Sequence, residues 1–357
     1  MALNYAEKWQ PQLIEILNQG CLTAPYITTN VNWLDAKTFH FTQMITSGYK
    51  PHNRAGGWNR GTYSQTDVPF TIAHTRDVEF FVDKAEVLDT NGTAKAENIS
   101  RTFQITQAVP ETDAYFYSKL AQLAIAKSLS TNTARSVYAA NAVYTKLKKL
   151  LAKAKLKRYR ANGTLIMYVA SEIMDALELS TELTKKVEVT QINEGGLSVE
   201  SRVTAIDTVP VFEVIDDERF YHNFDFATAD GGFALISQEY TAVVSPKAAD
   251  LGLYYEVADG VYTITDDTVI NAETTYYTKK EGSRKLNVVI ASTQTTFTVP
   301  RINSIFFFPP GQHTVGDGWL YQNRADWDTF VMPNGKDGEI DSIFVDIDTT
   351  EYVAEAE

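Results

Sequence analysis

The residues of this sequence that could carry out chemistry are its histidines, its acidic clusters and one glycine-rich stretch. The five histidines are scattered and form no HExxH motif and no Cys/His metal set: His40, His52, His74, His222 and His313. A single histidine in a polar loop is most often an ordinary surface residue. The histidines therefore predict no catalytic and no metal site.

Two groups of carboxylates could hold a hard cation, namely Asp216-Asp217-Glu218 and Asp341/Asp346/Asp348. Neither has the glycine and the ligand spacing of a calcium loop, so we interpret both as solvated. Gly48, Gly56, Gly57 and Gly61 match neither phosphate-binding nor dinucleotide-binding spacing, and no GxSxG motif is present. We predict that the protein is not an enzyme and has no catalytic residue, no bound cofactor and no metal.

Composition limits the class of protein further. A chain of 357 residues is longer than a single hydrophobic core usually accommodates, so two packed regions are expected. No segment approaches the roughly 18 consecutive apolar residues of a membrane helix, and the N-terminus is no secretory signal. One cysteine excludes a disulfide within the chain. The net charge of −13 argues against a protein that reads nucleic-acid sequence.

The elements that must position these residues begin with an N-terminal arm, residues 1–43, containing a short amphipathic helix over residues 4–18. Residues 44–78 are polar and rich in glycine, and read as a β-hairpin with little to bury by itself. We expect this ribbon to be buried against another chain. Val78, Phe80 and Val82 then alternate as a strand.

Two long helices are expected next. The first begins at Pro110, where a missing N–H is tolerated, and runs to residue 129 with Glu111 and Asp113 at the positive end of its dipole. Its expected buried face is Ala114, Tyr117, Leu120, Ala121, Ala124 and Ile125.

The second helix is expected from about residue 133 to Lys155, with N-cap candidates at Ser130, Thr131 and Asn132. Its end is strongly basic: Lys146, Lys148, Lys149, Lys153, Lys155, Lys157, Arg158 and Arg160. Such a surface could meet phosphates or an acidic partner, but we favour an ordinary solvated face.

The remaining chain alternates between strands and one short helix, which predicts an α+β fold. Residues 164–170 are a continuous apolar strand, a helix starts at a Ser171 cap, and several strands follow between residues 186 and 220. Residues 246–284 have hairpin patterns and no helical segment, so they read as an inserted all-β module. Core strands are expected at 231–237, at 286–292 and before Pro309-Pro310, and the acidic tail from Asp346 is expected to fray.

The order of these parts resembles the major capsid proteins of tailed bacteriophages with the Hong Kong 97 fold. The segments that carry the resemblance are GGWNRGTYSQTDVPFTIAHTRDVEFFVD (56–83), AVPETDAYFYSKLA (108–121), TLIMYVASEIMDAL (164–177), TAIDTVPVFEV (204–214) and NRADWDTFVMPNGKDGEI (323–340). It covers nearly the whole chain apart from the insertion.

The resemblance implies a division of the chain. Residues 44–78 would be an extended loop lying across a neighbouring subunit, which implies that deleting residues 50–70 leaves the subunit folded but unable to close shells. Residues 79–132 and 301–357 would form a peripheral domain with a spine helix at 110–129. Residues 133–300 would form an axial domain, interrupted by the 246–284 insertion.

The resemblance also implies partners. It implies self-assembly into hexamers and pentamers of an icosahedral head, assembled in the host cytoplasm and enclosing double-stranded DNA contacted non-specifically. Portal and head-completion proteins would join it, with no membrane involved. Met1 favours a separate scaffolding protein over one carried by the chain and cleaved off. Some relatives cross-link a loop lysine, but we do not assign that chemistry to Lys50.

Two alternatives remain open from the sequence. One is an encapsulin-like nanocompartment shell of the same fold, which would usually lack the β insertion. The other is a soluble binding module or enzyme that uses the insertion.

Overall fold

A computed structural model gives the architecture of the chain. It describes residues 21–28, 37–52, 56, 58–85, 96–153, 155–180, 193–194, 197–198, 205–215, 217–228, 231–244, 246–247, 250, 253–258, 261–265, 269–270, 274–333 and 339–354. The predicted helix over residues 4–18 and the predicted strand over 186–192 lie outside these ranges. The described residues form five sheets and a few helices, which confirms the predicted α+β class.

A six-stranded sheet forms the centre of the main core. In spatial order its strands are β4 (Ser130–Asn132), β17 (Ile343–Glu351), β14 (Arg284–Ser292), β5 (Leu165–Ala170), β9 (Val209–Val214) and β8 (Ala205–Ile206). The β5–β9 and β17–β4 pairs are parallel and the other pairs antiparallel. Every residue of β5 is buried, as expected of a continuous apolar run covered on both faces. The strands predicted at 164–170 and 286–292 are confirmed.

Four helices share this core: α4 (Val109–Ala126), α5 (Val143–Leu151), α6 (Leu156–Ala161) and α7 (Ser171–Glu178). The predicted face of the first helix is confirmed for its five buried members, whereas Ile125 is exposed. The predicted serine cap of α7 is wrong, because the Ser171 hydroxyl donates to Glu213 Oε1 at 2.7 Å and makes no cap hydrogen bond.

The second long helix predicted over residues 133–155 is wrong in its first half. Ser130, Thr131 and Asn132 form strand β4, because they pair in parallel with β17 instead of capping a helix. A 3-10 turn at Arg135–Val137 follows, and helix appears only from Val143. The helix then breaks, and α6 restarts at Leu156.

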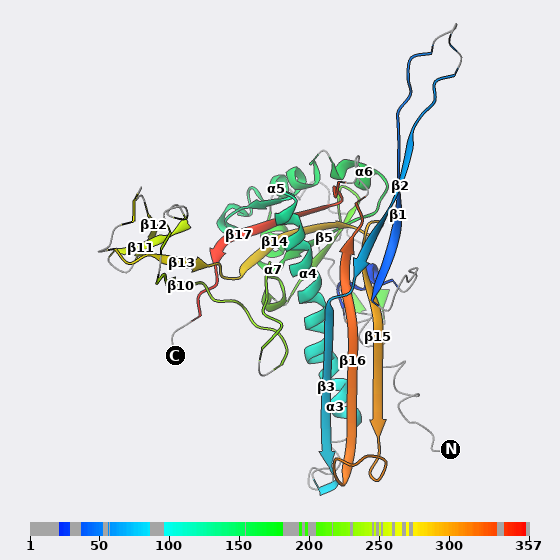
Figure 1. Cartoon of the computed structure of the whole chain (residues 1–357), viewed down its shortest axis with the longest axis vertical. Helices are drawn as coiled ribbons and strands as arrows, with labels where there is room; N and C mark the ends of the chain where they lie inside the picture. Colours follow the sequence, from blue (N-terminus) through cyan, green and yellow to red (C-terminus); the bar gives the residue numbers. More distant parts are fainter. Residues whose placement is uncertain are drawn as a thin grey trace.

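A long three-stranded antiparallel sheet extends away from the main core (Figure 1). Its order is β15 (Thr296–Phe308), β16 (Gly318–Val331) and β3 (His74–Asp83). Strand β15 stops before Pro309, as predicted. Helix α3 (Ala96–Phe103) lies beside β16, along the half of this sheet that is farther from the main core.

The spine of α3 and α4 is continuous, so the helix does not begin at Pro110 as predicted. One π-helical turn, Gln104–Ala108, joins the two segments, and Val109 N–H donates to the Gln104 carbonyl. Proline has no N–H to offer the preceding turn, and widened turns of this kind accommodate such a break. The sequence signal at Pro110 therefore marks an irregular turn inside a longer helix.

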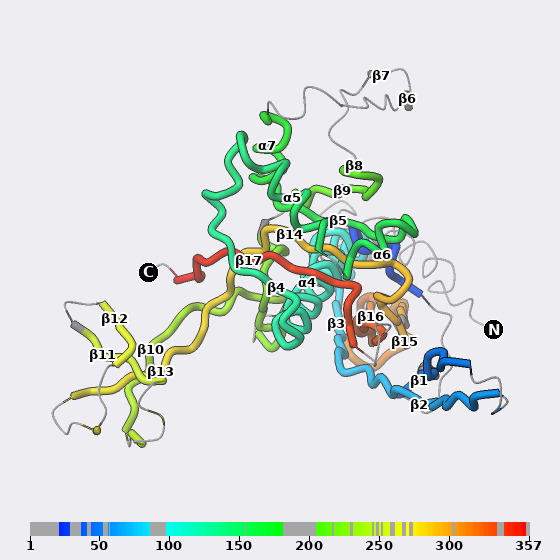
Figure 2. Tube along the Cα trace, turned by 90° about the horizontal axis from the view of Figure 1, so that it is seen from above, coloured from blue at the N-terminus to red at the C-terminus, as the bar shows by residue number. Residues whose placement is uncertain are grey.

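Two further sheets project from the body on opposite sides (Figure 2). One is the hairpin of β1 (Thr38–Thr46) and β2 (Tyr63–Thr71). The other has the order β10 (Glu239–Ala242), β13 (Tyr277–Lys280), β11 (Tyr255–Ala258) and β12 (Val261–Ile264). A small pair, β6 (Asn193–Glu194) and β7 (Leu197–Ser198), and 3-10 turns at Ala24–Tyr26 and Asp217–Arg219 complete the described elements.

Two predictions about strands are wrong. The described residues from 231 to 237 form no strand and only one bridge, between Asp225 and Ala234, because this loop folds back onto the spine through Arg76. The tail from Asp346 does not fray at once, because β17 (Ile343–Glu351) lies between β4 and β14. None of the described helices is both long enough and apolar enough to cross a lipid bilayer.

Candidate assembly surfaces

The hairpin of β1 and β2 is a regular ribbon that leaves the body of the chain. Its ladder pairs nine residues on each side, from Thr38 with Thr71 to Thr46 with Tyr63. Beyond the ladder, Ser47 N–H donates to the Thr62 carbonyl at 2.8 Å, and Thr62 N–H donates to Ser47 Oγ at 2.9 Å. These bonds hold the two strands together at the start of the tip.

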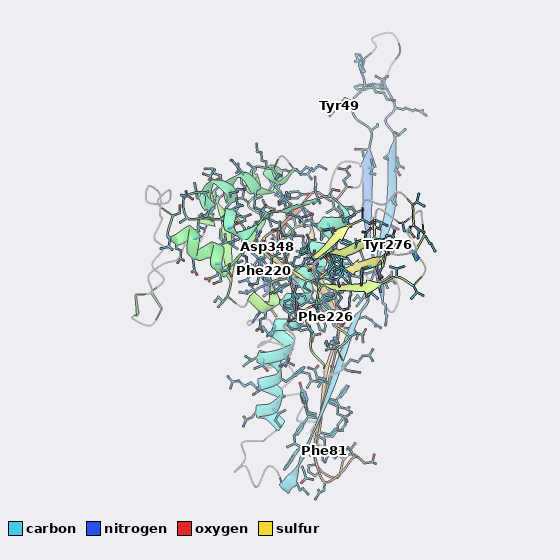
Figure 3. The ribbon with its side chains drawn as sticks, turned by 90° about the vertical axis from the view of Figure 1, so that its left-hand side faces the viewer. Tyr49, Phe81, Phe220, Phe226, Tyr276 and Asp348 are labelled. Atoms are coloured by element: carbon cyan, nitrogen blue, oxygen red, sulfur yellow. The ribbon has the colours of Figure 1, made fainter. Side chains whose placement is uncertain are left out.

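The outer half of the hairpin exposes large apolar side chains. Tyr49 is fully exposed, Trp58 is 94% exposed, Tyr63 77% and Met44 62%. Figure 3 shows Tyr49 far out along the ribbon, well away from the packed body. A hairpin of this length gains little stability by itself, and a run of exposed aromatic side chains on a soluble chain marks an interaction surface.

The inner half of the hairpin is anchored by aromatic packing. Phe39 of β1 and Phe70 of β2 lie 5.1 Å from Phe330 of β16, measured between ring centroids. Phe297 of β15 closes the cluster at 6.2 Å from Phe39. Edge-to-face and tilted ring pairs of this kind add stability beyond the burial of area alone. The ribbon is therefore fixed at its root and free at its tip.

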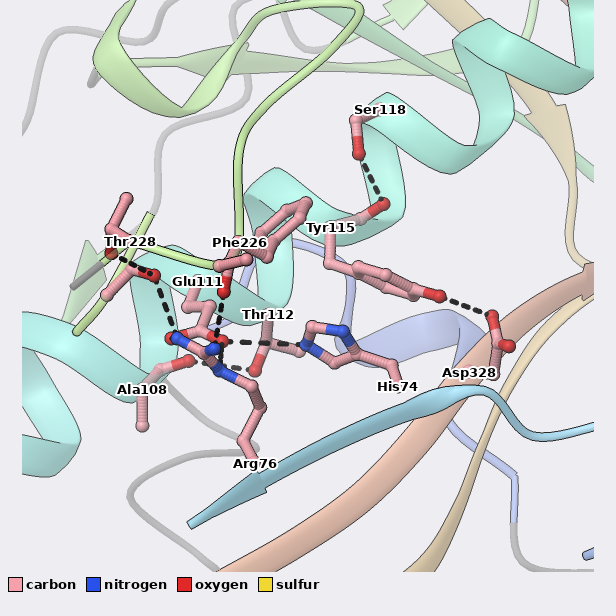
Figure 4. A network of polar contacts seen from close by, with 12 residues as sticks. His74, Arg76, Ala108, Glu111, Thr112, Tyr115, Ser118, Phe226, Thr228 and Asp328 are labelled. Atoms are coloured by element: carbon pink, nitrogen blue, oxygen red, sulfur yellow. Dashed lines mark hydrogen bonds and ion pairs between the residues drawn. The ribbon is translucent and has the colours of Figure 1, made fainter. Parts of the chain in front are cut away.

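A polar joint connects the root to the spine helix (Figure 4). We define the joint by His74 and Arg76 of β3 and Glu111 of α4. Arg76 Nε lies 2.6 Å from Glu111 Oε1, and its two terminal nitrogens donate to the carbonyls of Phe226 and Gly232 at 2.6 and 2.8 Å. Arg76 is half-buried and Glu111 is buried, and an ion pair in such a position that also satisfies backbone carbonyls holds its elements in one arrangement.

His74 lies between the joint and an aromatic cluster. Its Nε2 is 3.5 Å from Glu111 Oε1, and its ring stacks on Tyr115 at 4.0 Å. Phe226 and Trp327 present their edges to the same ring. The aromatic contacts fix the orientation of the histidine, so β3, β16, α4 and the loop around residue 226 meet at one rigid point.

Asp328 ties the start of β3 to the same helix. Its two carboxylate oxygens accept hydrogen bonds from Tyr115 Oη at 2.8 Å and from Ala73 N–H at 3.1 Å. Lys119 Nζ lies 3.4 Å from the same carboxylate. Burial, and then the Asp328 charge, raise the pKa of Tyr115 well above its usual value, so the hydroxyl stays a donor.

Asp113 was predicted to interact with the helix dipole, but it is a buried acceptor. Its carboxylate accepts from Leu22 N–H, from Thr23 N–H and hydroxyl, and from Arg219. Burial raises the pKa of Asp113 and these donors oppose that rise. The aspartate thus binds residues 22–23 and the 3-10 turn ending at Arg219 to the spine helix.

The acidic group Asp341/Asp346/Asp348 was interpreted as solvated, and this is wrong. Asp346 is fully buried and accepts hydrogen bonds from Thr131, Thr133, Tyr138 and Asn287. Asp348 accepts from Arg135 N–H, and Asp341 accepts from Arg158 and Tyr159. Each carboxylate therefore has its own partners within the fold, and they do not form a common cation site. Of the other acidic run, Asp216 lies outside the described residues and Glu218 is exposed.

The histidines lie at five separate places. His40 is in β1, His52 is near Trp58 in the hairpin tip, and His74 is in the joint. His222 Nδ1 accepts from Arg284 N–H, and the His313 ring contacts the Gly318 carbonyl. Within the part of the chain that the structure describes, no three His, Cys, Asp or Glu side chains gather as a metal site would require.

Comparisons with known proteins find similarity only at the level of structure. No protein-family model and no curated protein matches the sequence. The chain is similar to the mature capsid of bacteriophage PhiM1, at 13% identity and a TM-score of 0.47 over 88% of this chain and 82% of that chain. It is also similar to a structure from Microbacterium phage Oxtober96, at 9% identity and a TM-score of 0.49 over 92% and 91%.

A virus-like particle from Pyrococcus furiosus is similar as well, at 9% identity and a TM-score of 0.45, over 97% of this chain and 99% of that chain. At such identities and TM-scores these likenesses carry no weight of their own.

Proposed function

We propose that the chain is the major capsid protein of a tailed bacteriophage, a structural shell subunit without enzymatic activity. The observation that carries this proposal is the hairpin, which is rigid at its root and exposes aromatic side chains at its tip. A surface that reaches outward and differs from the surface it would meet makes a heterologous contact. Such contacts close into rings when the rotation between copies allows it.

The proposed division of labour follows the resemblance seen in the sequence. Residues 1–43 are an arm, residues 44–78 reach a neighbouring copy, residues 79–132 and 301–357 are peripheral, and residues 133–300 are axial with an insertion at 246–284. Strand β17 belongs to the proposed peripheral range but pairs with β14 and β4 in the six-stranded sheet, so the two regions share this sheet. In this proposal hexamers and pentamers of one chain form an icosahedral head around double-stranded DNA.

The proposed partners are a separate scaffolding protein, portal and head-completion proteins, and packaged DNA held without sequence preference. The proposed place of the protein is the virion, after assembly in the host cytoplasm. Each contact between copies can be weak, because many contacts repeated around each subunit give high avidity to the closed shell.

The first test removes the tip of the hairpin. Replacing residues 48–61 by Asn-Gly leaves the bonded pair Ser47 and Thr62 joined by a two-residue turn suited to a hairpin. We expect unchanged circular dichroism and thermal unfolding, together with loss of closed particles in negative-stain microscopy. An altered fold of the shortened subunit would contradict the assignment of this segment to contacts between copies.

The second test keeps the backbone and changes two exposed side chains. We expect Tyr49→Ser with Trp58→Ser to raise the protein concentration needed for assembly by up to about a thousandfold, because two buried aromatic anchors at about 2 kcal/mol each contribute about 4 kcal/mol. The matched control is Val244→Ser with Leu253→Ser, which removes exposed apolar side chains from the other side of the molecule. Equal effects of both pairs would argue against a specific contact at the tip.

Particles of the unaltered chain decide between shell types. Rings, sheets or shells support the proposal, and a stable discrete monomer at high concentration would overturn it. Double-stranded DNA in particles from a natural source supports a phage head, whereas protein cargo would indicate an encapsulin-like nanocompartment.

A further inference from the structure

Helices α5 and α6 carry a concentration of positive charge in an acidic protein. Between residues 146 and 160 there are eight lysines and arginines and no acidic residue, although the whole chain has a net charge of −13. The apolar side chains of the same helices are buried in the main core: Val143, Leu147, Leu150, Leu151, Leu156 and Tyr159. This packing leaves six of the eight basic residues exposed and Lys146 and Arg160 half-buried, and both helices lie along the top of the main body in Figure 1.

Four of these eight basic side chains have acidic partners among the residues that the structure describes. Lys148 and Arg160 both pair with Asp207, at 3.4 and 3.5 Å. Lys155 pairs with Glu339 at 2.8 Å, and Arg158 pairs with Asp341 at 2.7 Å. Three carboxylates thus face four basic groups, and both arginines of the segment are engaged.

The other four are lysines, which we call the basic face: Lys146, Lys149, Lys153 and Lys157. None of their ammonium groups has an ion pair or hydrogen bond with any residue in the described part of the chain, and Lys153 lies 5.0 Å above the ring of Phe344. Lys149, Lys153 and Lys157 are exposed and follow one another every four residues. Charges of one sign that lie close together repel one another, so the grouping of these lysines favours binding of a polyanion.

The residue types on this face distinguish between polyanions. Lysine is depleted at protein–protein interfaces, where arginine is preferred, and it binds phosphate as a point charge. Reading of bases instead uses the paired donors of arginine, asparagine or glutamine, and the basic face has none of them free. Free lysines without free arginines therefore suit the phosphate backbone of nucleic acid, contacted without regard to sequence.

We propose that the basic face on α5 and α6 binds the phosphate backbone of double-stranded DNA non-specifically. This inference rests on the proposed function, since it names the surface through which the shell subunit meets the DNA it encloses. The rest of the acidic chain repels the same DNA, so contact is confined to one place and remains weak and reversible.

The test measures the salt dependence of binding. The purified full chain is titrated into fluorescent duplex DNA of random sequence between 20 and 200 mM KCl, and log Kd is plotted against log salt concentration. Each phosphate contact contributes about 0.9 to the slope. We expect Lys149→Gln with Lys153→Gln and Lys157→Gln to reduce the slope by about 2.7, the contribution of three contacts.

The matched control has the same number and type of changes at three exposed lysines elsewhere, Lys127→Gln with Lys247→Gln and Lys280→Gln. Both variants have the same net charge, so only the position of the charge differs. An equal change of slope in both variants, or no binding by the unaltered chain, would overturn the proposal. Equally tight binding of a polyglutamate peptide of the same charge would also overturn it and would indicate an acidic protein partner.

Microscopy of the same samples separates this inference from the proposed function. Closed shells formed by a variant whose salt slope is reduced support both. Closed shells formed by a variant with an unchanged salt slope overturn only the inference that the basic face binds DNA. Failure of the unaltered chain to form any assembly overturns the proposed shell function.

Discussion

His222 shows how one backbone donor and burial determine the protonation of a side chain. Only 6% of the residue is exposed, and its Nδ1 accepts a hydrogen bond from Arg284 N–H at 2.8 Å. Burial, and then the charge of Arg284, lower the pKa of His222 below its usual 6.5. A proton on Nδ1 would point at the N–H that now donates to it, so the fold requires the neutral ring.

This geometry predicts the direction of a pH effect. The unfolded chain binds a proton at His222 more readily than the folded chain does. The contribution of the neutral His222 to stability is therefore fully present above pH 6.5 and is lost as the pH falls from 6.5 through the lowered pKa. We expect His222→Gln to lose less free energy of unfolding than the unaltered chain between pH 7.5 and 5.5, measured by urea denaturation. The control is His52→Gln in the exposed hairpin tip, which should keep the original pH dependence. An identical pH dependence in both variants would contradict the argument.

The roles of single polar residues were the least predictable part of the chain. Asp346 was interpreted as solvated because its charge is visible in the sequence, whereas its partners Tyr138 and Asn287 come from distant segments. The same limit applies to the joint, since nothing near Arg76 in the sequence indicates that the carbonyls of Phe226 and Gly232 will surround it. Local pattern gives hydrophobic faces, but long-range hydrogen bonds depend on the tertiary fold.

At the scale of elements, hydrophobic period was a reliable guide where it was uninterrupted. The apolar runs that became β5 and β14 and the buried face of α4 were predictable for this reason. Strand β17 was missed because Asp346 and Asp348 interrupt its apolar residues, although Ile343, Val345 and Ile347 alternate on one face. Its acids can occupy a central strand because β4, the turn after it and Asn287 of β14 supply donors.

The central position of β17 predicts that the chain cannot fold without it. Ending the chain after Ser342 removes four buried apolar side chains, Ile343, Phe344, Val345 and Ile347. At about 1.5–3 kcal/mol each they contribute roughly 6–12 kcal/mol, comparable to the entire stability of a typical domain. We expect insoluble protein or loss of cooperative unfolding by circular dichroism. Ending the chain after Ala354 is the control and should be silent; a cooperative fold in the shorter chain would show that β17 is dispensable.

The described part of the molecule has one large core, from which the three-stranded sheet, the hairpin and the four-stranded sheet extend. The hairpin leaves the body on one side and the four-stranded sheet on the other (Figure 2). The four-stranded sheet has its own small core, in which Tyr254 and Tyr276 are buried. A further stacked pair, Tyr240 and Tyr262 at 3.8 Å, joins its outermost strands β10 and β12. A unit that packs against itself in this way depends little on the main core.

The junction between the four-stranded sheet and the body predicts that this sheet can be removed from the chain without unfolding the rest. Gln238 N–H donates to the Tyr352 carbonyl and Ser283 N–H to the Ile236 carbonyl, so the entering and leaving segments are held side by side. A Cβ on Gly282 would lie 2.8 Å from Gln238 N, which shows how closely the two ends approach. Removing residues 239–281 and joining Gln238 to Gly282 through one glycine therefore needs little movement of either end.

We expect the chain without residues 239–281 to unfold cooperatively, with a free energy of unfolding within about 1 kcal/mol of that of the full chain, measured by urea denaturation. The main loss is the ion pair of Lys279 with Glu351 at 2.6 Å, together with the hydrogen bond from Gln238 to Tyr240. Lys279→Ala in the full chain is the control, because it removes the ion pair and leaves the sheet in place. If the chain without residues 239–281 aggregates while the stability of the Lys279→Ala variant is unchanged, the four-stranded sheet stabilises the body. Shells formed by the chain without residues 239–281 would show in addition that assembly uses the hairpin side of the molecule.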